Sequence, residues 1–220
     1  MIAVAIDGPA GAGKSTIARA VAQAMGFIYV DTGALYRALG LYAVQKGVDP
    51  ADERAVSALL QGARVELAFA EGEQRVFLCG EDVTGFIRTP QISMAASKVS
   101  ALPAVRAFLF DLQRELAEKH DVIMDGRDIG TVVLPHAQVK IFLTASAEDR
   151  ANRRYQEMLS KGQQADYQQV LADIRKRDEQ DENRAVAPLK PAPDAIVVDT
   201  TGNELEQSIA LLRNVIKERL

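Results

Sequence analysis

The chain has 220 residues, of which 48% are hydrophobic and 25% are charged. This length supports one hydrophobic core with a smaller lobe, so we expect a single domain over residues 1–220. The formal net charge of -4 argues against a general binder of nucleic acid or of membrane surfaces, which would need an excess of Lys and Arg, so any anionic ligand must be bound by local arginines.

The first predicted elements are a buried strand over residues 2–7 and a helix over residues 14–25, joined by a glycine-rich turn. The turn matches the phosphate-binding loop, or P-loop, in which two glycines five residues apart precede Lys and then Ser or Thr. Glycines let successive backbone N–H groups point at phosphate oxygens, and the start of the helix adds unpaired N–H groups. The residues expected to bind the phosphates of a nucleoside triphosphate are Gly8, Pro9, Ala10, Gly11, Ala12, Gly13, Lys14, Ser15 and Thr16.

Two side chains of this loop have specific expected roles. We expect Lys14 to be an exposed lysine that neutralises charge on the β- and γ-phosphates, and the Ser15 hydroxyl to hold Mg²⁺. The alternative is a flexible Gly/Ala turn with a solvated lysine, which the flanking strand and helix disfavour.

A second strand, over residues 27–31, ends at Asp31 and leads through Gly33 into a helix whose first turns present Thr32 and Arg37. A hydroxyl and an arginine at this position could hold the phosphate of an acceptor. The alternative is a helix cap beside a surface arginine, and the sequence leaves both open.

The middle of the chain has the patterns of a hairpin and a core helix, and we assign no catalytic or binding role to these patterns. Residues 63–79 alternate apolar and polar side chains on both sides of a turn at 71–73, which predicts an antiparallel hairpin in a small inserted lobe. Residues 104–120 follow Pro103 and place apolar residues at helical spacing, so we expect a helix with that face in the core.

A third strand, over residues 122–125, ends at Asp125, and Gly126 permits a sharp turn that we expect to expose Arg127 and Asp128. Asp125 suits an indirect contact to Mg²⁺ through water, and Arg127 could bind phosphate as a bidentate fork. A structural Asp–Arg pair is the alternative.

The last third of the chain is rich in arginine between two further strands, residues 139–144 and 195–199. Two sets of side chains are expected to share one helix face each, namely Arg150, Arg153 and Arg154, and Arg177, Asp181 and Arg184. An exposed, ion-paired helix would have the same pattern. A transferring phosphoryl group, however, needs mobile arginines to neutralise its charge.

The five strands alternate with helices, which predicts an α/β fold with a five-stranded parallel sheet of the P-loop NTPase type. Four of the strands end in an aspartate, namely Asp7, Asp31, Asp125 and Asp199. Ligands of open α/β sheets bind at the carboxyl ends of the strands, so the site should lie along that edge.

Cys79 is the only cysteine, and His120 and His136 are the only histidines, which excludes disulfides and a Cys/His zinc cluster. No apolar run approaches the roughly 18 residues that span a bilayer, and no basic region precedes the first apolar run. We expect a cytoplasmic, monomeric protein without nucleic-acid or membrane partners.

Two classes of P-loop protein fit poorly. Regulatory GTPases read guanine through an Asn-Lys-x-Asp stretch, which does not occur in this sequence. A nucleic-acid motor would be larger and more basic. A kinase acting on a small molecule remains.

In order and spacing, four segments resemble the bacterial cytidylate kinase family. They are the P-loop, residues 31–37, residues 125–131 and residues 183–189 (Asn-Arg-Ala-Val-Ala-Pro-Leu). The resemblance covers essentially the whole chain. The first segment is shared by many ATP-using enzymes, whereas the Asp-Gly-Arg-Asp of residues 125–128 and the last segment are much more specific.

The resemblance implies ATP-dependent transfer to CMP or dCMP, with ATP as phosphoryl donor and Mg²⁺ as cofactor. It implies a core of about residues 1–62, 92–149 and 167–220, an acceptor-binding insert of about residues 63–91 and a helical lid of about residues 150–166.

Family roles, carried onto the matching positions, give catalysis to Lys14, Arg127, Arg177 and Arg153. They imply that Arg37, Arg127 and Arg184 bind the acceptor phosphate. They imply that Ser97, Arg106 and Asp128 bind cytosine, and that Arg177 and Asp181 bind the ribose. Thr32, Tyr36 and Gly126 complete the expected acceptor site. Two alternatives remain open: a kinase for another small acceptor, such as a different nucleotide or shikimate, and a nucleotide-operated switch or regulatory ATP-binding module.

Overall fold

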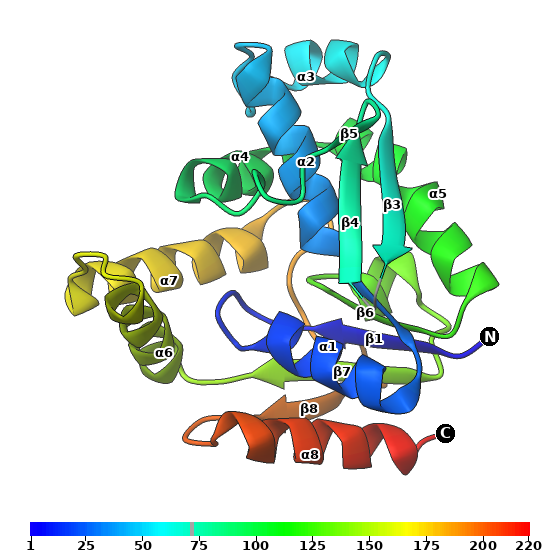
Figure 1. Ribbon diagram of the computed structural model, residues 1–220, viewed down its shortest axis with the longest axis vertical. Helices are drawn as coiled ribbons and strands as arrows, with labels where there is room; N and C mark the ends of the chain where they lie inside the picture. Colours follow the sequence, from blue (N-terminus) through cyan, green and yellow to red (C-terminus); the bar gives the residue numbers. More distant parts are fainter. Residues whose placement is uncertain (71–72) are drawn as a thin grey trace.

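Two sheets form the framework of the structure, a computed structural model that describes residues 1–70 and 73–220. The strands are β1 (Ala3–Asp7), β2 (Ile28–Asp31), β3 (Val65–Ala70), β4 (Glu73–Leu78), β5 (Glu81–Asp82), β6 (Val122–Gly126), β7 (Val139–Thr144) and β8 (Ile196–Asp199). The main sheet is parallel with the order β2-β6-β1-β7-β8, and the smaller sheet is antiparallel with the order β3-β4-β5 (Figure 1). The predicted five-stranded parallel sheet is confirmed.

Helices surround both sheets. They are α1 (Lys14–Met25), α2 (Thr32–Gln45), α3 (Glu53–Leu60), α4 (Pro90–Ser100), α5 (Pro103–Lys119), α6 (Ala147–Ser160), α7 (Tyr167–Asn183) and α8 (Leu205–Lys217), with a π-helical turn η1 (Ile129–Val133) after β6. The helix predicted after Pro103 is present, and its apolar positions are buried or half-buried in the core as expected.

The core is divided by the main sheet. On one face, α1 and α8 lie side by side and pack against the sheet through residues such as Ile17, Val21 and Leu212. On the opposite face, the sheet packs against η1 and the end of α5. Because both faces are covered by apolar side chains, the polar side chains of this sheet are left to the ends of its strands.

A second core lies among α2 to α5 and the smaller sheet. This sheet contains the predicted hairpin, with Val65 opposite Leu78 and Ala70 opposite Glu73, and also a short third strand, β5, that the sequence did not predict. Of the turn predicted at 71–73, residues 71 and 72 lie outside the described part of the chain.

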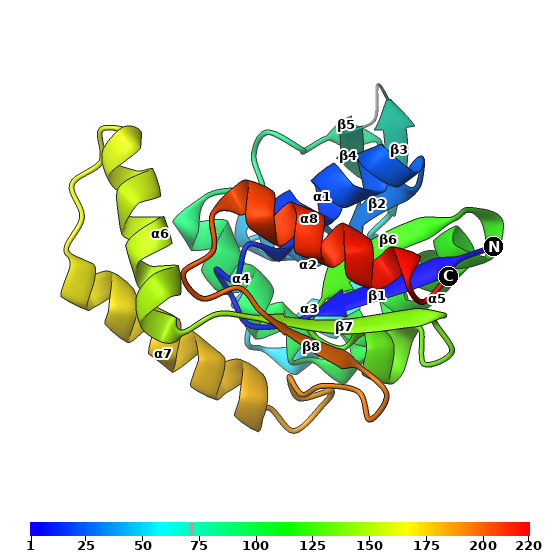
Figure 2. The same ribbon diagram turned by 90° about the horizontal axis from the view of Figure 1, so that it is seen from below.

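Helices α6 and α7 project from the rest of the molecule (Figures 1 and 2). They are held together by a small apolar cluster of their own around Ala151, Leu171 and Ile174. Few apolar contacts therefore tie this pair to the main core.

In the described residues, no single helix has the length and apolar character to cross a membrane. Only α4 and α5 taken together reach that composition, and they are bent by 97° where they meet.

Candidate active site

The loop between β1 and α1 runs close against β7 and ends at the N-terminus of α1. Gly8 has a φ of 152°, and a Cβ there would lie 1.9 Å from the carbonyl oxygen of Leu143, so only glycine fits. Gly13, with a φ of 82°, is the residue that precedes the first turn of α1. The strand, loop and helix thus have the arrangement that offers unpaired backbone N–H groups to an anion.

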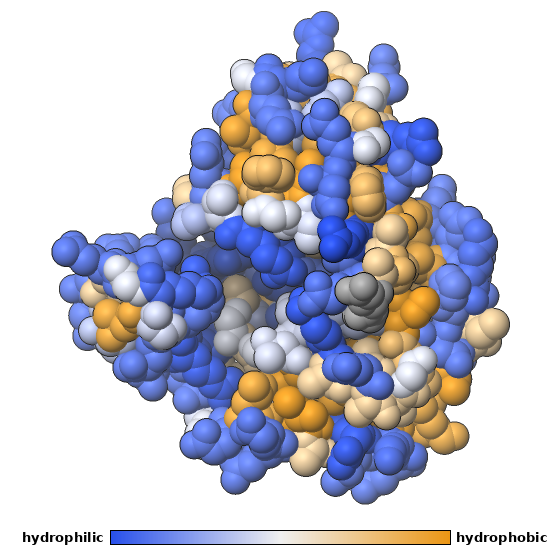
Figure 3. Space-filling view, viewed as in Figure 1, coloured by the Kyte–Doolittle hydropathy of each residue, from blue (hydrophilic) through white to orange (hydrophobic). Residues whose placement is uncertain are grey.

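A cleft of about 730 Å³ lies in front of this loop. Figure 3 shows a hollow between the α6–α7 pair and the rest of the molecule, edged largely by hydrophilic residues. Of the site residues expected from the sequence, all except Gly8 and Pro9 line the cleft. The parallel sheet brings these residues together because the carboxyl ends of β1, β2 and β6 open onto the same edge.

Lys14 is buried, with 5% of its surface exposed, so the expectation of an exposed lysine is wrong. Its Nζ donates a hydrogen bond to the carbonyl oxygen of Pro9 at 2.7 Å, which folds the side chain back over the loop. Burial, followed by the positive charge of Arg127, lowers the pKa of Lys14 to about 7. Burial therefore disfavours the ammonium form of Lys14 relative to a solvated lysine.

Asp125 is buried behind Ser15. The Ser15 hydroxyl donates to one carboxylate oxygen and the Tyr29 hydroxyl donates to the other, both at 2.9 Å. Burial, with a smaller contribution from the Asp31 carboxylate, raises the pKa of Asp125 to about 6. Ser15 and Asp125 thus bring a hydroxyl and a carboxylate oxygen next to each other at the phosphate-binding loop. Tyr29, which orients this carboxylate, was not predicted.

The segment after β2 forms the helix cap that the sequence offered as one interpretation, although its arginine, Arg37, is half-buried and not at the surface. The Asp31 carboxylate caps α2 by accepting from the N–H of Ala34 at 3.0 Å, and it also pairs with Arg37 at 2.6 Å. The Thr32 hydroxyl donates to the carbonyl oxygen of Asp125 at 2.8 Å, so it ties α2 to β6. Arg88 pairs with the same Asp31 carboxylate at 3.0 Å while its side chain stays half exposed in the cleft. Arg88 was missed, because it stands in an irregular segment without a periodic pattern.

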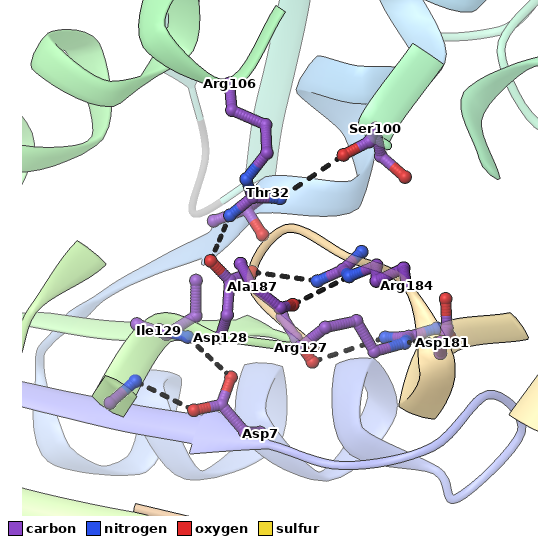
Figure 4. A network of polar contacts seen from close by, with 12 residues as sticks. Asp7, Thr32, Ser100, Arg106, Arg127, Asp128, Ile129, Asp181, Arg184 and Ala187 are labelled. Carbon is purple, nitrogen blue, oxygen red and sulfur yellow. Dashed lines mark hydrogen bonds and ion pairs between the residues drawn. The ribbon is translucent and has the colours of Figure 1, made fainter. Parts of the chain in front are cut away.

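The turn after β6 buries Asp128 instead of exposing it. Asp128 is 4% exposed, and its carboxylate pairs with Arg106 and, at 3.4 Å, with Arg184 (Figure 4). Burial raises the pKa of Asp128, and the two arginines oppose this shift. Arg106 also lies over the ring of Tyr36, at 5.9 Å from its centroid. The prediction of an exposed Asp128 fails because both arginines come from distant parts of the chain.

Arg127 is half-buried, not fully exposed as expected. Its Nε donates to Asp181 at 2.9 Å, so an Asp–Arg ion pair is present, and its carboxylate comes from α7. Burial, followed by the charge of Arg127, lowers the pKa of Arg177. Helix α7 ends at Asn183, and the next residue, Arg184, is extended and donates to the carbonyl oxygen of Ala187. The predicted shared helix face therefore does not include Arg184.

The arginines of α6 differ in how firmly their side chains are held. Arg150 is 5% exposed and donates to the carbonyl oxygens of Ala10 and Ala145 at 2.9 Å and to both oxygens of Asp178 at 3.0 and 2.6 Å. It is held in place, so the expectation that Arg150 acts as a mobile arginine is wrong. Arg153 remains at the cleft, where it donates to the carbonyl oxygen of Thr200 at 2.6 Å.

The loop between β8 and α8 also lines the cleft and was not predicted. Asn203 and Glu204 of the loop and Leu205 at the start of α8 line the cleft. The run of turn residues from Asp199 to Asn203, with a glycine at position 202, was the local signal of a turn there.

The fold and the cleft together define a class. A P-loop at the edge of a parallel sheet faces a cleft that contains many arginines, and this combination identifies a P-loop phosphotransferase, or kinase. Comparison with known proteins narrows the class. The family model for cytidylate kinase matches residues 4–218. The chain belongs to the cytidylate kinase family.

Curated relatives agree with this assignment. A cytidylate kinase of Carboxydothermus hydrogenoformans is 49% identical, with 97% of this chain and 96% of the relative covered. One from Caldicellulosiruptor bescii is 51% identical, with 94% and 91% covered. Among solved structures, an uncharacterized protein from Eubacterium ventriosum aligns over 100% of both chains with a TM-score of 0.54 and 13% identity, which shows a shared fold alone.

Proposed function

We propose that this chain transfers the γ-phosphoryl group of ATP to CMP and dCMP, giving ADP with CDP or dCDP. The relatives are named cytidylate kinases. One feature of the site carries the proposal beyond a generic kinase. A buried carboxylate, that of Asp128, lies between two guanidinium groups in the same cleft as the phosphate-binding loop.

A buried carboxylate beside an arginine suits cytosine. Cytosine has an exocyclic amino donor beside the N3 and O2 acceptors, so a carboxylate can accept from the amino group while an arginine donates to an acceptor. We assign this role to Asp128, Arg106 and Ser97. Uracil has a carbonyl oxygen in place of the amino group, and that oxygen would face the Asp128 carboxylate without a hydrogen bond.

The acceptor phosphate and the ribose would bind nearby. Arg37, Arg127 and Arg184 are cations of the cleft that could share the phosphate of CMP, and Arg177 and Asp181 would bind the ribose. Each of the first three is now engaged with a carboxylate, at 2.6, 2.9 and 3.4 Å respectively. Binding of a phosphate would exchange part of these contacts for charge-assisted bonds to the ligand. Thr32, Tyr36 and Gly126 would complete the walls of this site.

On the donor side, the loop from Gly8 to Thr16 would bind the phosphates of ATP. Lys14 would leave the carbonyl oxygen of Pro9 and take the β- and γ-phosphates, where the added negative charge favours its protonated form. Arg153 would approach the transferring group from α6. With these cations in place, an oxygen of the CMP phosphate attacks the γ-phosphorus in line, and the bond to the bridging oxygen of ADP breaks.

The oxygen donors at Ser15 and Asp125 fit Mg²⁺, a hard cation that prefers oxygen ligands. Within residues 1–70 and 73–220, no cluster of three His, Cys, Asp or Glu side chains could hold a metal ion by itself. This suits an ion that keeps several waters and shares phosphate oxygens, with Asp125 acting through water. Bound there, Mg²⁺ would neutralise charge on the β- and γ-phosphates.

We further propose that residues 150–166 act as a lid and residues 63–91 as an acceptor-binding insert on a core of residues 1–62, 92–149 and 167–220. Closure of the lid would exclude water that could otherwise hydrolyse ATP. Because Arg150 is held by Ala10 and Asp178, the moving part would begin beyond it.

A coupled assay of ADP release, run with a panel of nucleoside monophosphates and with shikimate, tests the proposal. We expect CMP and dCMP to be phosphorylated with the highest kcat/KM and UMP with a much lower value. Preference for another acceptor would contradict the substrate assignment, and ATP binding without transfer to any acceptor would favour a switch or a regulatory module.

A further inference from the structure

Asp7 is a buried carboxylate that the proposed reaction does not use. It ends β1, is 3% exposed and does not line the cleft. Its two oxygens accept from the backbone N–H groups of Ile129 and Gly130 at 2.7 and 2.8 Å (Figure 4). These are the first two N–H groups of η1. Burial raises the pKa of Asp7 to about 6, although both backbone donors oppose the shift.

Asp128 precedes η1 and therefore stands where an aspartate ordinarily caps its own helix. Three other aspartates of this chain, Asp31, Asp52 and Asp166, do so by accepting from an N–H three residues later, at 3.0, 3.0 and 2.8 Å. Asp128 makes no such bond. Figure 4 shows its carboxylate between Arg106 and Arg184, with Asp7 on the other side of the turn.

We propose that Asp7 is a positioning residue, which caps η1 in place of Asp128 and thereby leaves the Asp128 carboxylate to read the base of the acceptor. This inference rests on the proposed function, because it concerns selection of cytosine over uracil. Without Asp7, the free N–H groups of η1 would compete with Arg106, Arg184 and the base for the Asp128 carboxylate.

The surroundings of Asp7 support a dedicated role. Gly130 packs against Lys140 so closely that a Cβ would lie 3.3 Å from the lysine side chain and 3.4 Å from the nearer Asp7 oxygen. The backbone of Asp7 is held independently of its side chain, since it is in register with Gly126 of β6 and with Phe142 of β7. Replacing the side chain should therefore disturb η1 and Asp128 more than the phosphate-binding loop that follows.

The test is Asp7→Asn, in which an amide NH₂ replaces one acceptor and faces a backbone N–H. We expect kcat/KM for CMP to fall about tenfold or more and the CMP-to-UMP ratio to narrow by a similar factor, while KM for ATP changes little. A matched control is Asp199→Asn. Asp199 also ends a strand of the same sheet and accepts two hydrogen bonds, from the N–H and hydroxyl of Thr201, but it lies away from η1. The control should keep the CMP-to-UMP ratio of the wild type.

A double-mutant cycle shows whether Asp7 acts through Asp128. In an Asp128→Asn background, Asp7→Asn should have no further effect on the CMP-to-UMP ratio. A ratio unchanged by Asp7→Asn in an otherwise CMP-selective enzyme would overturn the inference alone, whereas a wild type that does not prefer CMP would overturn the proposed function. If Asp7→Asn does not fold, Gly130→Ala can be used instead, because its methyl group would lie 3.4 Å from the Asp7 oxygen that accepts from the N–H of residue 130. It should narrow the ratio in the same direction, and an unchanged ratio there would equally overturn the inference.

Discussion

Replacement of Arg150 by Met tests whether this arginine is a structural tie. Its guanidinium makes four hydrogen bonds, two to backbone carbonyl oxygens and two to Asp178, and its side chain is 5% exposed. Removing one partner of a buried ion pair lowers the free energy of unfolding by about 3–5 kcal/mol. The Asp178 side chain is 16% exposed and can regain water, so we expect the lower end, about 3 kcal/mol of unfolding free energy.

The assay is urea unfolding followed by far-UV circular dichroism, with the transition midpoints compared at a common m-value. Arg154→Met is the matched control on the same helix. Arg154 pairs with Glu157 at 2.8 Å, but both side chains are nearly half exposed, so its loss should cost about 0–1 kcal/mol. If Arg150→Met cost no more than Arg154→Met, the buried network would not stabilise the fold, and Arg150 would return to the set of mobile arginines.

Three further predictions concern catalysis and can be checked by steady-state kinetics or calorimetry. Asp128→Asn should lower kcat/KM for CMP and reduce the ratio of kcat/KM for CMP to that for UMP, since the amide offers both a donor and an acceptor. If this ratio did not change, another residue would select the base. Arg127→Lys should lower kcat/KM by about tenfold to a hundredfold, because an ammonium keeps the charge but lacks the planar fork of donors that pairs with Asp181 and can bind a phosphate in a bidentate way. Wild-type turnover in this variant would mean that Arg127 supplies only a diffuse charge or a structural ion pair. Lys14→Ala should lose nearly all turnover. Because the pKa of Lys14 is lowered to about 7, the free protein at pH 8 holds it mostly neutral, and ATP binding should then take up close to one proton. Titration calorimetry in buffers of different ionisation enthalpy measures that uptake, and equal uptake by Lys14→Ala would assign the proton to another group.

The sequence determined the fold class and most of the site. Buried strands and amphipathic helices follow from periodicity, which is local, and their alternation implies a parallel sheet. The P-loop is also local, since its chemistry depends on spacing within eight residues. All predicted site residues other than Gly8 and Pro9 line the cleft, because residues at the carboxyl ends of parallel strands meet at one edge.

Only the tertiary structure decided which charged groups meet. Asp128 pairs with residues 22 and 56 positions away, and Asp7 bonds to N–H groups more than 120 positions away. These partners are set by the strand order β2-β6-β1-β7-β8 and by where α5 and the end of α7 lie at the cleft, which no local pattern encodes. The burial of Lys14 and Arg150 has the same origin. A side chain that looks solvated in the sequence becomes buried when distant segments cover it, and its polar atoms must then find partners inside the protein.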